Sequence, residues 1–400
     1  MSDSHRGVVV TGLGVLTAFG RGVAPLAEGL RQGQSALAPL TAFAPQGLEI
    51  GMAAQVGVPL AIPEGFQDDR KAALALQAAE DAVGGADMSQ AGVYLGTGLS
   101  SVTPLELYQD AAPYRSKGGF DRQALHRDLS PDHVAPGRHL PERTTALLAR
   151  SIGANGPQMT SFSACAAGAL AIAHATRAIR RGEIDRALAG GMDAMIHPLG
   201  VLSFLVLGAL SPGTCRPFDR NREGFVIGEG AAMLLLESEE LARARGAHIL
   251  ARVLGGGSSV DAHNVTAPHP EGKGAELSMR RAMKEAGLVR VDHVNAHGTG
   301  TPLGDRAEAA AIARVLGPEV PVSSIKGAIG HCIAAAGAVE AAACIAALAQ
   351  GWSPGTAGLE DPEDLGINAQ AEPQQDHPQT ILSNSFGFGG QNTSLIFGRA

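Results

Sequence analysis

Two segments rich in alanine and glycine restrict the fold of this chain more than any other feature. Residues 165–179 read CAAGALAIAHATRAI, and residues 332–348 read CIAAAGAVEAAACIAAL. Alanine favours helix, and side chains this small allow neighbouring backbones to approach closely. We therefore expect two helices that lie between sheets. Each segment follows a strand and a turn, which indicates an internal duplication, although no repeat is visible in the letters.

The rest of the chain alternates between strand-like and helix-like patterns, which predicts an α/β fold with helices packed on sheets. At 400 residues the chain can form two domains or one large layered unit. Residues 361–378 are expected to form a loop, and residues 108–139 a surface excursion. Strands are expected at 7–11, 92–96, 158–163, 186–189, 231–237, 249–257, 293–296, 320–323, 380–384 and 393–397, and helices at 70–84, 141–153, 165–182, 274–287, 305–316 and 332–350.

Composition excludes several classes of function. A net charge of −8 gives no overall attraction to nucleic acid or to an anionic membrane. The four cysteines, at 165, 215, 332 and 344, show no CxxC spacing, so neither a disulfide framework nor a zinc module is indicated, and a reducing cytoplasm fits. The apolar run 329–348 is about as long as a bilayer span, but it carries His331 and Glu340 and is expected to be a buried helix.

Cys165 lies where an expected strand ends and an expected helix begins. Backbone N–H groups and the helix dipole stabilise negative charge there, so we expect this thiol to ionise more easily than a free one. The small neighbours of Cys165 leave room for a substrate and for an oxyanion facing a backbone N–H. The alternative is a structural cysteine that acts as a small apolar side chain.

Two histidines occupy comparable positions elsewhere in the chain. His297 ends an apolar strand and precedes the turn Gly298-Thr299-Gly300-Thr301, while Lys326 and His331 precede the second alanine-rich helix. Backbone dipoles at that helix start favour a neutral imidazole at His331. Each histidine alone could be structural, but together with Cys165 they form a candidate site.

Seven motifs in this order resemble the elongating β-ketoacyl-[acyl carrier protein] synthases of the thiolase-like condensing enzyme superfamily. They read RGVVVTGLGVLTAFG, SACAAGALAIAHA, CRPFDRNREGFVIGEGAAMLLLE, SSVDAHNVTAPHPEG, NAHGTGTPLGDRAEA, SSIKGAIGHCIAAAGAVEA and SNSFGFGGQNTSLIF. The resemblance implies a thiolase-like fold, layered α-β-α-β-α, from two duplicated halves. Residues 1–245 would carry the nucleophile, and residues 246–400 the two histidines. The implied activity is that of an acyltransferase: decarboxylative Claisen condensation of a malonyl carrier with a cysteine-bound acyl chain, in fatty acid or polyketide and polyene elongation.

The resemblance also implies a role for each matching residue. Cys165 would be the nucleophile, and His297 and His331 would polarise the malonyl thioester and stabilise its enolate. Lys326 and Glu308 would order the site. The backbone N–H groups of Cys165 and Phe388 would form the oxyanion hole, and Thr299 and Thr301 would bind the phosphopantetheine arm.

The acyl pocket and the carrier-docking surface are implied on fewer residues. Phe388, in the turn GFGG, would be a gate, and Phe204 and Leu105 would line the acyl pocket; the alternative is a glycine-rich turn with a core phenylalanine. Leu205 and Val206 replace smaller residues, and Gly208 stands where relatives can carry a carrier-docking arginine. Arg70 and Lys71 would then contact the carrier, although they could equally be a solvated helix terminus.

The implied partner is an acyl carrier protein, which holds the substrates on its phosphopantetheine, and no permanently bound cofactor or metal is implied. The chain would form a homodimer, or a heterodimer with a ketosynthase-like chain. Three other functions fit the residues less well. A non-catalytic chain-length partner would lack the nucleophile, a cysteine hydrolase would leave one histidine and the lysine unexplained, and a zinc site would lack a fourth ligand.

Overall fold

A mixed sheet of twelve strands forms the centre of the computed structural model, which describes residues 6–45, 47–66, 69–98, 112–116, 118–128 and 140–400. Its strands are β1 (Val8–Thr17), β2 (Gly20–Arg21), β5 (Gly92–Thr97), β8 (Gln158–Ser161), β9 (Arg186–Ala194), β10 (Glu229–Ser238), β11 (Ala251–Val260), β12 (His293–Asn295), β13 (Pro321–Ser323), β14 (Asn368–Ala369), β15 (Thr380–Gly387) and β16 (Gln391–Arg399). The helices are α1 (Val23–Arg31), α2 (Arg70–Val83), α4 (Arg122–Asp128), α5 (Arg143–Ser151), α6 (Ala167–Arg180), α7 (Pro198–Val206), α8 (Glu239–Ala244), α9 (Lys273–Ala286), α10 (Pro302–Leu316), α11 (Lys326–Ile329) and α12 (Ala336–Gln350).

The strand order shows that the two halves repeat one topology. In the first half the spatial order is β8-β5-β9-β10-β1, and in the second it is β13-β12-β15-β16-β11, with β14 outside β13. Numbered along the chain, both halves have the order 3-2-4-5-1. β1 and β11 join the halves by a short antiparallel pairing, in which Val9 faces Arg252 and Val10 faces Ala251. The expected boundary at 245/246 falls between α8 and β11, and this exact division stays a proposal.

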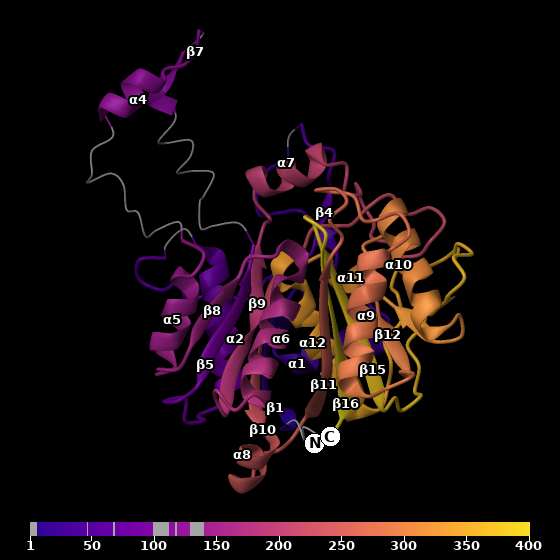
Figure 1. The fold of residues 1–400 in the computed structure, drawn as a ribbon. Helices are drawn as coiled ribbons and strands as arrows, with labels where there is room; N and C mark the ends of the chain where they lie inside the picture. The colour runs from indigo at the N-terminus through magenta and orange to yellow at the C-terminus, as the bar shows by residue number, and fades with distance from the viewer. Residues whose placement is uncertain (1–5, 46, 67–68, 99–111, 117, 129–139) are drawn as a thin grey trace.

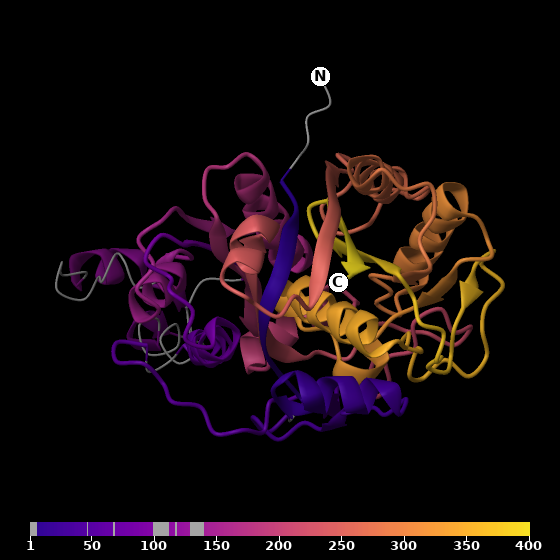
Figure 2. The ribbon, with the colours of Figure 1, turned by 90° about the horizontal axis from the view of Figure 1, so that it is seen from below.

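The two alanine-rich helices, α6 and α12, lie between the halves of the sheet, as expected (Figures 1 and 2). α2 and α5 cover the outside of the first half, and α9 and α10 the outside of the second, which gives α-β-α-β-α layers. α6 contacts α12 through small residues: a Cβ on Gly168 would lie 3.1 Å from Cβ of Ala338, and one on Gly337 would lie 2.8 Å from Cβ of Ala169. Larger side chains would therefore separate the two helices.

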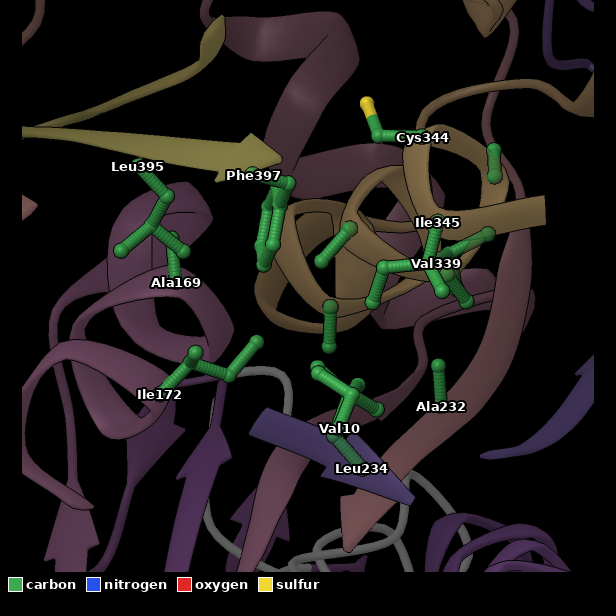
Figure 3. Packing of buried hydrophobic residues seen from close by; sticks show 14 of the residues in the cluster. Val10, Ala169, Ile172, Ala232, Leu234, Val339, Cys344, Ile345, Leu395 and Phe397 are labelled. Atoms are coloured by element: carbon green, nitrogen blue, oxygen red, sulfur yellow. The ribbon is translucent and has the colours of Figure 1, made fainter. Parts of the chain in front are cut away.

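The main hydrophobic core surrounds these helices. Figure 3 shows Ile172 of α6 and Val339 of α12 among side chains of the flanking strands, including Val10 and Phe397. Residues 333–350 are apolar and long enough to cross a membrane, but 89% of that window is buried inside the protein. Burial of this kind is typical of the core helix that the sequence predicted.

All ten expected strands and all six expected helices are present, with shifts of a few residues at their ends. The helices α1, α4, α7, α8 and α11 were not expected. The expected loop at 361–378 is irregular apart from the short strand β14. Within the expected excursion, the described residues form α4 and a small hairpin, which lie apart from the body of the protein (Figure 1).

Candidate active site

Cys165 lies on a short 3₁₀ turn, Ala164–Ala166, between β8 and α6, and its side chain is buried. Ala164 has a positive φ of 44°, an uncommon conformation for a residue with a Cβ. The second half repeats this turn at Ile333–Ala335, where Ile333 has a φ of 48°. Ala334 occupies there the position that Cys165 occupies in the first half. The duplication has thus produced two similar turns, and only one of them carries a thiol.

His331 is the polar side chain in direct contact with Cys165: its Nε2 lies 3.1 Å from the sulfur. The backbone on both sides of the ring is fixed, because His331 donates to the carbonyl oxygen of Val226 at 2.8 Å and accepts from the N–H of Gly228 at 2.9 Å. The ring of Phe225 packs edge-on at 4.9 Å between centroids. The imidazole is therefore held in place by its backbone and by an aromatic wall.

His297 completes the group from the end of β12. Its ring centroid lies 5.4 Å from that of His331, at an interplanar angle of 81°. Glu308 of α10 accepts hydrogen bonds from the backbone N–H groups of His297 and Gly298, each at 2.8 Å, and from the side-chain amide of Asn384 at 3.1 Å. Glu308 thus positions the backbone that carries His297.

Lys326 forms a buried ion pair with Glu340 of α12, and each side chain is only 1% exposed. The sequence had grouped Lys326 with Glu308, but the ammonium pairs with Glu340, because Glu308 is engaged by backbone N–H groups. The role of Glu340 was missed. The available signal was a single carboxylate within an alanine-rich helix, since a buried charge requires a partner.

Burial keeps both imidazoles neutral. It lowers the pKa values of His297 and His331 well below the usual 6.5, and the nearby charge of Lys326 lowers both further. A neutral imidazole can donate one N–H while it accepts at its other nitrogen. The expectation of neutral histidines is consistent with these shifts, although the dominant cause is burial and not a helix dipole.

The expectation that Cys165 ionises easily was wrong for the resting protein. Burial raises the pKa of its thiol to about 12, and the lowering effects of Lys326 and of the Phe388 N–H do not compensate. The reason is that the start of α6 lies inside the protein, where a thiolate loses its hydration. The thiol is therefore protonated at rest.

The turn that follows β15 brings Phe388 over the nucleophile, with its backbone N–H directed at the sulfur of Cys165. This close approach requires glycine, since a Cβ on Gly387 would lie 2.9 Å from the carbonyl oxygen of Ser163. The rings of Phe388 and Phe204 stack at 6.4 Å between centroids. The two expected pocket phenylalanines are thus neighbours, whereas Leu105 lies outside the described residues.

A cavity of about 320 Å³ connects these groups to the surface. Cys165, His297, His331 and Phe388 line it, together with Thr299 and Thr301, whose hydroxyl oxygens lie 3.0 Å apart. The thiol, the two imidazoles and the two threonines expected on the pantetheine path therefore face one space, whereas Lys326 does not line it. In the part of the chain that the structure describes, no cluster of three or more His, Cys, Asp or Glu side chains could hold a metal ion.

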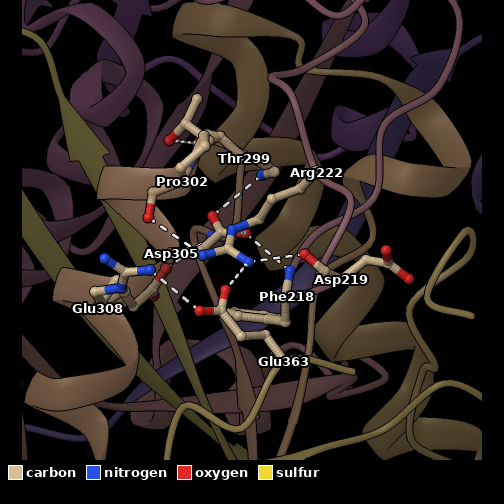
Figure 4. A network of polar contacts seen from close by, with 12 residues as sticks. Phe218, Asp219, Arg222, Thr299, Pro302, Asp305, Glu308 and Glu363 are labelled. Atoms are coloured by element: carbon tan, nitrogen blue, oxygen red, sulfur yellow. Dashed lines mark hydrogen bonds and ion pairs between the residues drawn. The ribbon is translucent and has the colours of Figure 1, made fainter. Parts of the chain in front are cut away.

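A polar network behind the cavity fixes the turn between His297 and α10 (Figure 4). Asp305 accepts from the backbone N–H groups of Phe218 at 2.8 Å and Gly300 at 3.1 Å, and it lies 3.5 Å from the guanidinium of Arg222. Arg222 also pairs with Glu363. Burial raises the pKa of Asp305 to about 7. This network was not expected, because its members come from three separated segments.

Arg70 and Lys71 do not form the exposed basic pair that the sequence suggested. Lys71 is buried, at 7% exposure. Arg70 donates to the buried carboxylate of Glu229 at 2.7 and 2.9 Å and to the carbonyl oxygen of Val56 at 2.7 Å. These contacts anchor the start of α2 to β10, although the Arg70 side chain remains 44% exposed. Burial removes Lys71 from the expected carrier-docking surface, and a docking role of Arg70 stays a prediction.

Comparisons with known proteins agree with this geometry. Residues 5–242 match the family described as "Beta-ketoacyl synthase, N-terminal domain", and residues 250–360 match "Beta-ketoacyl synthase, C-terminal domain". The chain is 35% identical to 3-oxoacyl-[acyl-carrier-protein] synthase 2 of Synechocystis sp. over 98% of this chain and 97% of that protein.

Two solved structures extend the similarity to the fold. "The ishigamide ketosynthase/chain length factor" superimposes with a TM-score of 0.88 at 32% identity, over 99% of this chain and 100% of that one. "AntDE:AntF (apo): type II PKS acyl-carrier protein in complex with its ketosynthase bound to the hexaketide" has a TM-score of 0.85 at 28% identity, over 99% and 100%. The chain belongs to the β-ketoacyl synthase family, with the thiolase-like fold and the acyltransferase activity of an elongating 3-oxoacyl-[acyl-carrier-protein] synthase.

Proposed function

We propose that Cys165 takes the acyl chain from its carrier as a thioester, with His331 as the base. The observation that carries this proposal is the 3.1 Å contact between the sulfur of Cys165 and Nε2 of His331 inside the cavity. Because the thiol is protonated at rest, it must lose its proton as it attacks the acyl carbonyl, and a neutral imidazole within reach can take it. The intermediate's oxyanion faces the backbone N–H groups of Cys165 and Phe388. Its collapse breaks the carrier's C–S bond, and the departing thiolate recovers the proton from His331.

His297 and His331 then serve the second half of the reaction. The bond between the malonyl carboxylate and the neighbouring carbon breaks, CO₂ leaves, and the electron pair forms an enolate. The enolate oxygen accepts hydrogen bonds from the two neutral imidazoles. The enolate carbon attacks the acyl carbonyl on Cys165, so that a C–C bond forms while the S–acyl bond breaks. Low pKa values at both rings support this role, since the N–H donors are uncharged.

Acyl carrier protein is the proposed partner, because the solved relative AntDE:AntF is a ketosynthase with its acyl-carrier protein. The pantetheine arm would pass Thr299 and Thr301, whose hydroxyls line the cavity. No permanently bound cofactor enters this reaction. We assign the protein to the cytoplasm, where its four buried free thiols would remain reduced.

The proposed assembly is a dimer formed through β8. This strand ends the sheet, and Met159 and Phe162 in and beside it are exposed. An edge strand with exposed apolar side chains favours pairing with another chain. The partner is an identical chain or a chain-length factor, as in the similar ishigamide ketosynthase/chain length factor.

A specialised polyketide or polyene pathway is proposed over general fatty acid synthesis. Leu205, Val206 and Gly208 depart from the pattern of the elongating enzymes, and these residues lie beside the pocket phenylalanine Phe204. A panel of acyl carriers of different lengths and starters, incubated with malonyl carrier, tests this assignment. Uniform use of saturated chains of every length would contradict it.

The mechanism is tested by four variants and intact-mass detection of the acylated protein. Cys165→Ala should lose the acyl adduct, whereas Cys344→Ala, which removes another buried thiol, should keep it. Cys165→Gln should decarboxylate malonyl carrier without condensing it. His297→Ala in the Cys165→Gln background should lose that decarboxylation. An adduct that persists in Cys165→Ala, or unchanged decarboxylation without His297, would refute these roles.

A further inference from the structure

Exposed apolar side chains surround the mouth of the active-site cavity. Leu207, Val265 and Leu303 all line the cavity, yet they are 46%, 75% and 64% exposed. Val206, the last residue of α7, is 78% exposed beside Leu207. We name these four residues the apolar rim. They come from the end of α7, the segment between β11 and α9, and the start of α10, and Figure 1 shows α7 and α10 at the same end of the protein.

In the part of the chain that the structure describes, the positive charges closest to this mouth, including Lys273 beside the lining residue Gly272, are already paired with carboxylates. Among the described residues that line the cavity, none is lysine or arginine. Arg306, one turn after Leu303, pairs with Glu363 at 3.1 Å. Arg216, whose backbone borders the turn at Gly300, pairs with Glu360 at 3.4 Å. These two cations already face carboxylates, so they offer little net attraction to an acidic partner.

We propose that the apolar rim is the docking surface for the carrier domain, which binds it through an apolar face instead of through acidic side chains. This inference rests on the proposed function. A substrate attached to a carrier reaches Cys165 only through the mouth, so the carrier's surface must cover the rim while its arm fills the cavity. Exposed apolar patches that continue into a binding cavity mark interaction sites, and covering them favours binding.

The mutational test uses substitutions close in shape that make the rim polar: Val206→Thr, Val265→Thr and Leu303→Asn, alone and combined. The measured quantity is the KM for an acyl-loaded carrier protein divided by the KM for the same acyl group on free pantetheine. This ratio cancels changes inside the cavity. It should rise about tenfold in the triple variant, since interface side chains of this size contribute at that level. Val289→Thr, at a 93% exposed position beyond the end of α9, is the matched control and should leave the ratio unchanged.

Charge and salt separate apolar docking from electrostatic docking. Leu303→Glu and Leu303→Lys should both raise the ratio, and the wild-type KM for the carrier should change less than about threefold between about 50 and about 500 mM NaCl. A lower ratio in Leu303→Lys with a steep salt dependence would overturn the proposal in favour of an acidic carrier face.

Two further outcomes are decisive. An unchanged KM ratio in the triple variant overturns the proposal. If light scattering also shows a changed oligomeric state in that variant, the rim is assigned to contact with a second copy of this chain. Failure of the proposed function is distinguishable, because wild-type protein would then condense neither the carrier-bound nor the pantetheine-bound substrate.

Discussion

The buried pair of Lys326 and Glu340 allows a prediction whose sign depends on pH. Both side chains are 1% exposed, and each is the counter-ion of the other. Glu340→Leu leaves an isolated ammonium in the core, while Lys326→Met leaves an isolated carboxylate. Either remaining group can escape an unpaired charge by becoming neutral, and the free energy of that proton transfer sets a ceiling on the loss of stability.

The largest possible loss of stability differs between the two single variants. At about pH 7, removing the proton of an ordinary lysine costs about 4.6 kcal/mol, so Glu340→Leu should reduce the free energy of unfolding by about 4 kcal/mol. Protonating an ordinary glutamate costs about 3.5 kcal/mol at that pH, so Lys326→Met should cost about 3 kcal/mol. Burial already raises the pKa of Glu340 above its usual range in the intact pair, which is the direction of that escape. The double variant replaces the pair by apolar side chains and should recover most of either loss.

Urea unfolding at two pH values measures these differences. Lowering the pH to about 5.5 makes protonation of Glu340 easier and deprotonation of Lys326 harder, each by about 2 kcal/mol. The penalty of Lys326→Met should therefore fall, and that of Glu340→Leu should rise. Parallel pH dependence in the two single variants, or a double variant less stable than both, would refute the reasoning.

Two further predictions concern burial and close packing. Burial lowers the pKa of His293 to about 3, so this residue stabilises the fold above pH 6.5 and loses that contribution as the pH falls towards 3. The difference in unfolding free energy between wild type and His293→Gln should therefore change by about 2 kcal/mol between about pH 7 and about pH 5. His263→Gln, on an exposed loop, is the control, and a pH-independent gap for His293 would contradict the prediction. Gly96→Ala would press against the backbone of Ala167 and Gly168 at the start of α6, and it should lower stability by about 1–3 kcal/mol and also lower condensing activity. Gly57→Ala, which meets open space, should not, and equal effects of the two substitutions would contradict the packing argument.

The elements with a clear period or composition were predictable from sequence. α6 and α12 are recognisable because a run of alanine and glycine has few other structural uses. β10 is recognisable because residues 231–236, AAMLLL, form a continuous apolar run, which the structure buries. α7 was not expected, because Pro198–Val206 is apolar on most sides and lacks the polar face that marks a surface helix in a sequence. The exposure of Val206 at its end is explained only by the position of this residue beside Leu207 at the cavity mouth.

The sequence predicted the main residues of the site better than the ion pairs that hold them in place. Cys165 and His297 follow the ends of strands, and His331 lies just before the second alanine-rich helix, positions that local sequence reveals. Glu340 and Asp305 were missed, because their partners Lys326 and Arg222 come from other segments and only the fold brings them together. Lys71 was expected on the surface, because a basic residue at a helix start is usually exposed, but tertiary packing buries it.

Burial gives the reaction centre its defining property, which is neutrality at rest. It raises the pKa of Cys165 and lowers those of His297 and His331, so both the thiolate and the imidazolium forms are disfavoured. A pair that were already charged would attract and orient water, whereas a neutral thiol and two neutral rings develop charge only as substrate atoms arrive. The backbone N–H groups of Cys165 and Phe388 are then fixed donors that need no rearrangement. The duplicated turn explains the geometry, since one copy supplies the sulfur and the other, at Ile333–Ala335, immediately follows the histidine that contacts it.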